Sequence, residues 1–316
     1  MTREPVDLLN RISTNPERKN AMATTHRHPT PTRHPVAGRD DVIALRADRP
    51  KPFLLLALSL SALLVLATAP LTAARARALQ PAAAPTVVLV HGAWADETGW
   101  NDVVARLQKD GYRTITPRLS VTDPTADVAT VRAALDAIAG PKILVGHSYG
   151  GYVVTNAAYG RDDVRALVYT AAFTPDEGDT LLSLGVGYVP PAGLAHLVWT
   201  GEPLASLAYI DPAWFRHDFA QDLNPKAAAE MSVHQLPIAF PILTTPSGPG
   251  AWHSIPSWFA ISGADRMIDP ALQLAEASRI GATTVTFDDA SHAGGFTHYA
   301  ARFTKLVEDA AVATAQ

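Results

Sequence analysis

The residues most able to carry chemistry form the pentapeptide Gly146-His147-Ser148-Tyr149-Gly150, which matches Gly-x-Ser-x-Gly. It follows an apolar run, residues 142–145, that predicts a strand, and it leads into a helical pattern. In that setting the two glycines allow a very tight turn, which holds the serine hydroxyl out above the edge of a sheet. The pattern therefore predicts that Ser148 is a nucleophile. A glycine-rich turn of purely structural purpose is the alternative.

A serine hydroxyl is a poor nucleophile near neutral pH, so it needs a base, and the base needs a carboxylate to orient it. When the serine stands on such a strand–turn–helix, the acid and then the histidine follow it along the chain. His292 lies just beyond the last predicted strand, residues 283–287, and is the expected base. The alternative is that His292 merely caps the following helix. His253 lies in an irregular region and His298 on a helix, so both are less well placed.

The expected acid is Asp265, which directly follows the strand predicted at residues 258–262. From there a carboxylate can reach the far nitrogen of the histidine. Asp176, which follows an earlier strand, is the alternative position for this acid. Asp269 is better explained as the N-cap of a helix that begins at Pro270.

Acyl-transfer chemistry at the serine also requires two backbone donors that bind the oxyanion. One is expected to be the amide of Tyr149, the residue after the nucleophile. The other is expected to come from the loop after the first strand, residues 91–94, with the amide of Ala93 as the best candidate. His91 is expected to hold this loop together, and a direct catalytic role for it is the alternative.

These residues are positioned by strand and helix patterns that alternate from residue 85 onward. The strand patterns are nearly continuous runs of apolar residues, as in strands that are buried on both faces of a parallel sheet. Gly111, Gly140 and Gly281 stand where helices would end in a left-handed residue. The predicted fold class is therefore α/β, a doubly wound and mostly parallel sheet. The predicted strands are 86–90, 113–116, 142–145, 166–170, 258–262 and 283–287, and the predicted helices are 100–110, 127–139, 149–159, 270–280 and 297–313.

The alternation stops between about residues 176 and 256, a stretch rich in Pro, Gly and aromatic residues. No strand pattern is evident there, and only residues 222–235 predict a clear helix. The stretch is too long for a plain connection between two strands. We therefore expect an inserted cap over the carboxyl ends of the strands, where such sheets bind ligands.

The N-terminal part differs from the rest of the chain. Residues 1–50 are polar and rich in Pro, Arg and His, which predicts a disordered tail. Residues 51–78 combine a basic flank, an apolar run and a small-x-small pattern, which together are typical of a signal peptide. The run is also long enough for a membrane anchor. We therefore expect an exported protein, periplasmic or extracellular, that touches a membrane only if residues 51–78 stay uncleaved. Its folded domain is expected to span residues 79–316, with the cap at about 176–256.

The composition restricts the possible partners. The formal net charge is −4, but residues 1–78 hold 12 Lys and Arg against 6 Asp and Glu, whereas residues 79–316 hold 14 against 24. An acidic body argues against nucleic acid, because phosphate binding requires a basic surface. There is no cysteine, which excludes disulfides, thiol nucleophiles and cysteine-ligated zinc. No metal, phosphate or dinucleotide motif is found, so we expect no metal and no cofactor. The sequence does not specify an oligomeric state.

Four motifs in this order resemble the α/β-hydrolase superfamily, and the resemblance extends over about residues 85–312. It is closest to the branch that contains plant methyl esterases, hydroxynitrile lyases and small bacterial esterases. The resemblance implies an α/β-hydrolase fold. The hydroxynitrile lyases of this branch carry a lysine directly after the catalytic histidine, where this chain has Ala293, so cyanohydrin cleavage is disfavoured. The four motifs are residues 87–94 with Trp100, residues 146–150, residues 262–266 and residues 289–292.

The expected function is hydrolysis of a small or medium apolar carboxylic ester through an acyl-enzyme, with a small-molecule ester as the partner. The apolar preference is inferred from the aromatic residues of the cap. One alternative is a lyase or cofactor-free oxygenase on the same scaffold. Another is a non-catalytic binding protein, although such proteins usually lack a member of the triad, and all three members are present here. A fold by itself does not decide among these functions.

Overall fold

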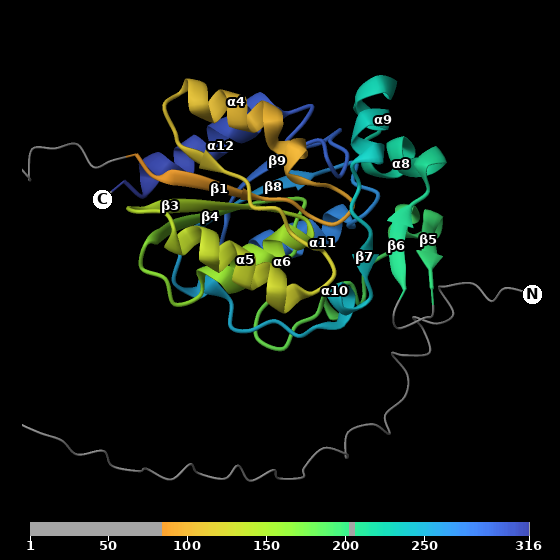
Figure 1. Cartoon of the computed structure of the whole chain (residues 1–316), viewed down its shortest axis with the longest axis horizontal. Coiled ribbons are helices and arrows are strands. Elements are labelled where there is room, and N and C mark those ends of the chain that lie inside the picture. Colours follow the sequence, from red (N-terminus) through yellow and green to blue (C-terminus); the bar gives the residue numbers. More distant parts are fainter. Residues whose placement is uncertain (1–83, 202–205, 316) are drawn as a thin grey trace, which may run out of the picture. The chain divides into compact units, whose positions relative to one another are not determined.

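A six-stranded sheet, in which all neighbouring strands are parallel, forms the centre of the fold (Figure 1). The computed structural model describes residues 84–201 and 206–315, which belong to one compact unit of the chain, Pro81–Gln316. The strand order is β2-β1-β3-β4-β8-β9. The strands are β1 (Thr86–Val90), β2 (Thr114–Ile115), β3 (Lys142–His147), β4 (Val164–Thr170), β8 (Ser257–Ser262) and β9 (Thr283–Phe287).

Helices cover both faces of this sheet, as the alternating pattern predicts. The helices α4 (Asn101–Lys109) and α12 (Ala300–Ala313) lie on one face, and α5 (Pro124–Asp136) and α6 (Tyr149–Ala158) on the other (Figure 1). A further helix, α11 (Pro270–Arg279), packs against β8. The prediction of a doubly wound α/β sheet is therefore confirmed.

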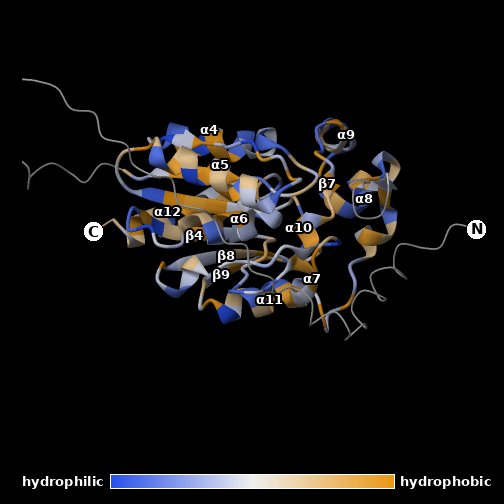
Figure 2. Ribbon diagram, turned by 60° about the horizontal axis from the view of Figure 1, so that its bottom comes forward, coloured by the Kyte–Doolittle hydropathy of each residue, from blue (hydrophilic) through white to orange (hydrophobic). Residues whose placement is uncertain are grey.

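The core lies between the sheet and these helices. The strands β1 and β3 are buried over their whole length, which explains their unbroken apolar sequences. The helix α12 buries Phe303, Leu306, Val307 and Ala310, and this spacing places one apolar stripe against the sheet. Figure 2 shows hydrophobic and hydrophilic residues mixed along the covering helices, as expected when only one side of a helix is buried. Burial on both faces was a wrong expectation for β9, where Thr283, Thr284 and Thr286 are exposed, because β9 is an edge strand.

Several local signals lie where the sequence predicted them. The backbone angle φ is +91° at Gly111 and +61° at Gly281, so each of these glycines ends its helix in the left-handed region. Gly140 also has a positive φ, +81°, but the expectation that it ends a helix was wrong, because that helix already ends at Asp136. The predicted helix at 127–139 begins earlier than expected, at Pro124, because the side chain of Asp123 caps it.

The segment predicted to be the cap, and called the cap below, lies between β4 and β8. The expectation that it holds no strand was wrong. Three short strands pair into an antiparallel sheet in the order β5-β6-β7, beside α8 and α9 (Figure 1). Strands of two to four partly exposed residues are too short to give an alternating pattern. The elements are α7 (Leu181–Leu184), η3 (Ala192–His196), β5 (Leu197–Thr200), β6 (Leu207–Ile210), α8 (Pro212–Phe219), α9 (Pro225–Val233), β7 (Ile238–Ala239), α10 (Pro241–Thr244) and η4 (Ala251–His253).

The tail and the signal or anchor segment predicted at residues 1–50 and 51–78 lie outside the described residues, and their assignment stays a prediction. Within residues 84–201 and 206–315, no helix has the length and apolar character needed to cross a membrane.

Candidate active site

Ser148 stands on a sharp turn between β3 and α6. Its backbone angles are φ +54° and ψ −123°, so a residue other than glycine is held in the left-handed region. Such strain persists only where the surrounding structure enforces it. Three backbone hydrogen bonds hold the turn. The carbonyl of Ser148 accepts from the amides of Gly151 (2.9 Å) and Phe173 (3.3 Å), and its amide donates to the carbonyl of Thr170 (3.3 Å).

The glycines around this serine are required by close backbone contacts. A Cβ atom at Gly146 would lie 2.7 Å from the carbonyl oxygen of Gly150. At Gly150 it would lie 2.4 Å from the carbonyl oxygen of Val90, in β1. At Gly92 it would lie 2.7 Å from Cβ of Ser148. The loop after β1 therefore lies directly against the candidate nucleophile.

The predicted base and acid are in contact. The Nδ1 atom of His292 lies 2.8 Å from Oδ2 of Asp265, and both side chains are fully buried. Because a carboxylate only accepts, the imidazole donates through Nδ1, and its Nε2 atom is left without a proton in the neutral ring. Nε2 has no hydrogen-bond partner among the described residues, and the hydroxyl of Ser148 does not bond to it in this structure. Such bonds commonly tighten only when substrate is present.

The loop predicted to form the oxyanion hole lies next to Ser148, since a Cβ atom at Gly92 would contact it. Neither Ala93 nor Tyr149 uses its amide in a backbone hydrogen bond of the loops and turns that the structure describes. Tyr149 is the first residue of α6, so its amide also lacks an acceptor within the helix. The neighbouring amide, that of Trp94, donates to the carbonyl of Leu236 (3.3 Å). The amides of Ala93 and Tyr149 are therefore left without a backbone acceptor among the described loops and turns, which is compatible with their predicted role.

The side chain of Tyr149 anchors the start of α6. Its hydroxyl donates to Oδ2 of Asp127 at 2.9 Å, and both residues are buried. Burial, together with the neighbouring carboxylate, raises the pKa of Tyr149 far above its usual range, so this phenol stays a donor. The same carboxylate accepts from the amides of Ser120 (2.7 Å) and Val121 (3.1 Å). The network ties the residue after the nucleophile to the loop before α5.

Gln273, which the sequence analysis did not single out, orients the acid. Its side-chain amide donates to Oδ2 of Asp265 at 2.7 Å, the same oxygen that accepts from His292, and its carbonyl accepts from the amide of Ser262 at 2.9 Å. The other carboxylate oxygen accepts from the amides of Met267 and Ile268. The available signal was a polar residue on the buried side of the helix predicted at 270–280.

His147 lies beneath the base. Its Nε2 donates to the backbone carbonyl of His292 at 3.1 Å, and the two imidazole rings are 4.6 Å apart between centroids. Burial lowers the pKa of His147 well below its usual value, and the charge that His292 carries when protonated lowers it further. His147 is therefore neutral, and it supports the base through packing and one hydrogen bond.

His91 has the structural arrangement that was expected of it. Its Nδ1 donates to the carbonyl of Gly92 (3.0 Å), and its Nε2 accepts from the amide of Leu119 (3.0 Å). Burial lowers its pKa, which favours the neutral ring that these two bonds require. Both nitrogens are thus occupied in holding the loop.

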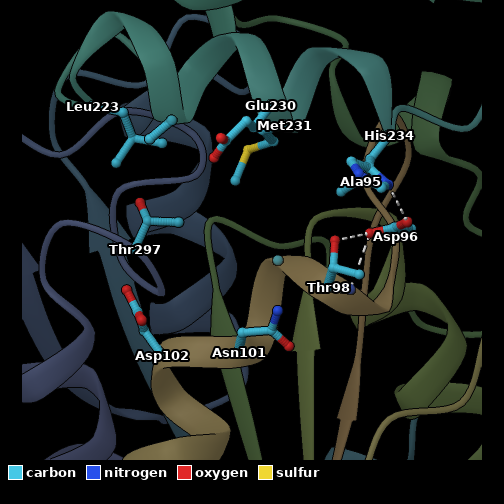
Figure 3. A pocket seen from close by; sticks show the side chains of 12 residues that line it. Ala95, Asp96, Thr98, Asn101, Asp102, Leu223, Glu230, Met231, His234 and Thr297 are labelled. Carbon is cyan, nitrogen blue, oxygen red and sulfur yellow. Dashed lines mark hydrogen bonds and ion pairs between the residues drawn. The ribbon is translucent and has the colours of Figure 1, made fainter.

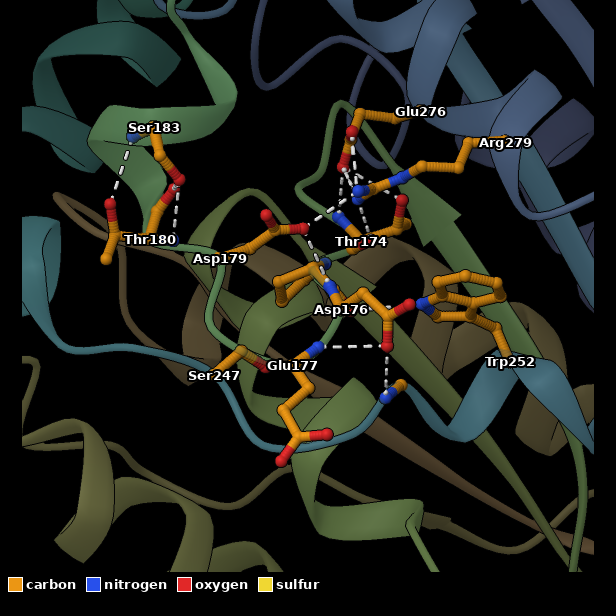
Figure 4. Close-up of polar contacts among 12 residues, drawn as sticks. Thr174, Asp176, Glu177, Asp179, Thr180, Ser183, Ser247, Trp252, Glu276 and Arg279 are labelled. Carbon is orange, nitrogen blue, oxygen red and sulfur yellow. Dashed lines mark hydrogen bonds and ion pairs between the residues drawn. The ribbon is translucent and has the colours of Figure 1, made fainter.

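Asp176, the alternative acid, bonds to residues other than His292, and its surroundings are drawn in Figure 4. Its carboxylate bonds to His253 (2.9 Å) and to the amides of Glu177 (2.9 Å) and Gly250 (3.1 Å). These contacts close a surface loop next to the ion pair of Glu276 and Arg279, which is also drawn in Figure 4. The alternative is therefore not supported.

Asp269 caps α11, as the sequence predicted. Its side chain accepts from the amide of Ala271 at 2.9 Å, and Pro270 lies in the first turn of that helix.

A cavity of about 580 Å³ lies between α9 and the η2 (Glu97–Trp100) and α4 region (Figure 3). Acidic side chains line it, namely Asp96, Asp102 and Glu230. Asp96 caps η2 and is held by the hydroxyl and the amide of Thr98. None of the three triad residues lines this cavity, so we assign it no part in catalysis.

The chain belongs to the α/β-hydrolase family, whose family model matches residues 87–306. A carbendazim hydrolyzing esterase from Nocardioides sp. (strain SG-4G) is 37% identical over 124 residues, which cover 35% of this chain and 51% of that protein. The match thus spans about half the length of that relative. An α/β hydrolase from Aspergillus novofumigatus (strain IBT 16806) is 26% identical over 211 residues, which cover 60% of this chain and 82% of that protein.

Solved structures with the same fold include polyneuridine aldehyde esterase, with a TM-score of 0.63 and 16% identity, covering 71% of this chain and 98% of that one. A pyrethroid hydrolase has a TM-score of 0.63 and 23% identity, covering 73% and 99%. The methylesterase MES16 from Arabidopsis has a TM-score of 0.59 and 20% identity, covering 71% and 98%. These likenesses establish the fold and include a methylesterase, the kind of enzyme that the motifs resemble.

Proposed function

We propose that this protein is a serine-dependent carboxylic ester hydrolase that works through an acyl-enzyme. The observation that carries the proposal is the buried pair of His292 and Asp265, with the free Nε2 atom of the base facing no other partner among the described residues. The strained turn at Ser148 and the free amides beside it support the same reading. The relatives named esterase and hydrolase also support ester hydrolysis.

In the first half-reaction, the Oγ atom of Ser148 attacks the ester carbonyl while Nε2 of His292 takes its proton. Asp265 accepts from Nδ1 and stabilises the imidazolium that forms. The tetrahedral oxyanion is bound by the amides of Ala93 and Tyr149, which are fixed before the reaction and need no reorganisation. Collapse of this intermediate transfers the proton from His292 to the leaving alcohol and leaves an acyl group on the serine.

In the second half-reaction, His292 takes a proton from water, which attacks the acyl carbonyl. The same two amides bind the second oxyanion, and the serine is released when His292 returns the proton. The residues of the chain supply every proton transfer in this cycle.

We propose a small or medium apolar ester as substrate. The support comes from aromatic side chains of the cap: Trp199 and Tyr209 pack against the hydrophobic core, and Trp199 also contacts the ring of Phe240. The indole of Trp94, beside the oxyanion loop, donates to the carbonyl of Ala208 in β6 at 3.0 Å and so ties that loop to the cap.

The test is hydrolysis of a chain-length series of p-nitrophenyl esters by the wild type, by Ser148→Ala and by a control, Ser278→Ala, at an exposed position of α11. We expect kcat to fall by on the order of 10⁴-fold or more in Ser148→Ala and to be unchanged in the control. A fluorophosphonate probe should label the wild type at Ser148 and not the variant.

Activity that survives in Ser148→Ala would contradict the serine mechanism. No hydrolysis of any ester, together with no labelling of Ser148, would overturn the proposal. Assays for aldehyde release and for oxygen uptake would then test the lyase and oxygenase alternatives.

A further inference from the structure

One short segment of the cap, residues 217–222 at the end of α8, contacts both catalytic loops. On the side of the acid, it binds the two neighbours of Asp265. The guanidinium of Arg266 donates to the carbonyl of His217 at 2.7 Å, and the side chain of Gln221 donates to the carbonyl of Ala264 at 2.6 Å. The loop that carries the acid is thus held on both sides of Asp265.

On the side of the base, the same segment binds the two neighbours of His292. The amide of Ala293 donates to the carbonyl of Phe219 at 3.0 Å. The carboxylate of Asp222 accepts from both the amide (2.9 Å) and the hydroxyl (2.6 Å) of Ser291. The ring of Phe219 also packs edge-on against the imidazole of His292, with 4.9 Å between centroids.

The loop of the base is shaped to receive this carboxylate. A Cβ atom at Gly294 would lie 2.2 Å from Oδ2 of Asp222 and 2.7 Å from the amide nitrogen of Ser291. The glycine at position 294 therefore makes room for the contact. Hydrogen bonds to an ionised carboxylate are stronger than neutral ones, and Asp222 makes two of them to Ser291, the residue before His292.

We propose that Asp222 is a positioning residue for His292, and that the cap segment 217–222 holds the acid and the base in their catalytic arrangement. The inference rests on the proposed function, because it assigns His292 the role of base. The cap is thus part of the frame of the triad as well as a cover for the substrate. A pure cover would act on substrate binding, whereas a positioning residue acts on kcat.

The test compares Asp222→Ala with Asp222→Asn. An asparagine can accept from the amide of Ser291 and donate to its hydroxyl, so it keeps both contacts, whereas alanine removes both. We expect kcat for a p-nitrophenyl ester to fall by about 100-fold in Asp222→Ala, since small displacements of catalytic groups have effects of this size. KM should stay the same, and Asp222→Asn should restore most of kcat.

The matched control is Asp211→Ala, which removes an aspartate side chain that caps α8 in the same cap and, among the described residues, accepts from the amide of Ala213. It should leave kcat unchanged. A milder variant, Ser291→Ala, loses one of the two contacts and should lower kcat by about 3- to 10-fold. It also tests the proposal if Asp222→Ala does not fold.

A second readout does not depend on activity. The Nδ1 proton of His292, shared with Asp265, gives a strongly deshielded proton NMR signal, which we expect in the wild type and in Asp222→Asn. In Asp222→Ala it should be broadened or lost. An unchanged signal and an unchanged kcat in Asp222→Ala, or a rise in KM alone, would overturn the proposal. If the wild type hydrolyses no ester, the proposed function fails, and the NMR signal in the variants still decides whether Asp222 positions His292.

Discussion

The hydrogen bonds of Asp265 determine the orientation and the tautomer of His292. Four hydrogen-bond donors converge on its carboxylate, two on each oxygen, and one of the four is the imidazole of His292. Because this carboxylate is held by three other donors, it accepts from the imidazole in one fixed orientation of the ring. The proton of the neutral ring therefore lies on Nδ1, which fixes the tautomer. His147, below the ring, then limits its movement on the opposite side. The orientation of the base is therefore a property of its neighbours.

The substitution Gln273→Met tests the contribution of the glutamine, because methionine has a similar volume and no polar group. It leaves the amide of Ser262 without its partner and removes one donor from Asp265. We expect the free energy of unfolding to fall by about 1–3 kcal/mol and kcat to fall by about 10- to 100-fold. Urea unfolding and ester hydrolysis measure the two effects. The control is Gln108→Met, at an exposed bond to Thr114, where neither should change. A loss of stability with kcat retained would show that Gln273 has only a structural role.

His147 predicts a pH dependence of stability. Its pKa in the folded protein lies well below the unfolded value of 6.5, because burial disfavours the charged ring. Below about pH 6.5 the unfolded chain therefore takes up a proton that the folded protein does not, and the free energy of unfolding decreases as the pH falls. Between about pH 7.5 and 5.5 we expect the wild type to lose about 1 kcal/mol more than His147→Gln. Chemical denaturation at several pH values measures this. Equal losses in both proteins would contradict the assignment.

At the scale of elements, the position of α6 relative to β1 and β4 decides where the serine stands. The helix approaches so closely that Cβ atoms at Gly150 and Gly151 would lie 2.4 Å from carbonyl oxygens of Val90 and Phe173. Backbone atoms at these distances cannot move aside independently. The glycines after the serine therefore fix the distance of the helix from the sheet, and with it the height of the serine.

The substitution Gly150→Ala tests this close approach. We expect it to lower the free energy of unfolding by about 3 kcal/mol, since overpacking against backbone cannot be relieved by a side-chain rotation. Gly185→Ala is the control, because the nearest atom to its Cβ would be 3.7 Å away and its φ is −77°. It should change stability by no more than about 0.5 kcal/mol. Thermal unfolding distinguishes the two, and equal stabilities would show that α6 can shift at little cost.

At the scale of the whole molecule, the described residues belong to one unit in which sheet and cap depend on each other. Sheet loops carry the three residues of the candidate triad, and cap residues bind the neighbours of two of them. The family model covers residues 87–306, and the compact unit extends over Pro81–Gln316. The described residues and the candidate site that they form lie within this part of the chain.

The chain shortened to residues 81–316 should therefore fold and hydrolyse esters as the full chain does. We expect the same melting temperature and the same kcat, because every contact described for the site lies within this range. Differential scanning calorimetry and the ester assay on both proteins provide the comparison. A shortened chain that is unfolded or has a much lower kcat would show that residues 1–80 contribute to the domain.

The sequence alone determined the elements of the central sheet and the order of the candidate reactive residues. The strands 86–90 and 283–287 have the predicted bounds, because a buried parallel strand and a strand between two turn signals are local patterns. The Gly-x-Ser-x-Gly pentapeptide predicted Ser148 as the nucleophile, because its glycines are required by close contacts within one turn and with the adjacent strand. Such signals depend on neighbours along the chain, which is why they could be read without a structure.

The tertiary structure decided which side chains from distant parts of the chain are in contact. Asp176 and Asp265 both follow strands, and only the spatial order of the strands shows that Asp265 bonds to His292 while Asp176 bonds to His253. The contact between Asp222 and the loop of the base joins residues 69 positions apart along the chain. No local pattern encodes a contact at that separation, because it depends on how the cap packs against the ends of the strands. The frame that holds the triad therefore became visible only in three dimensions.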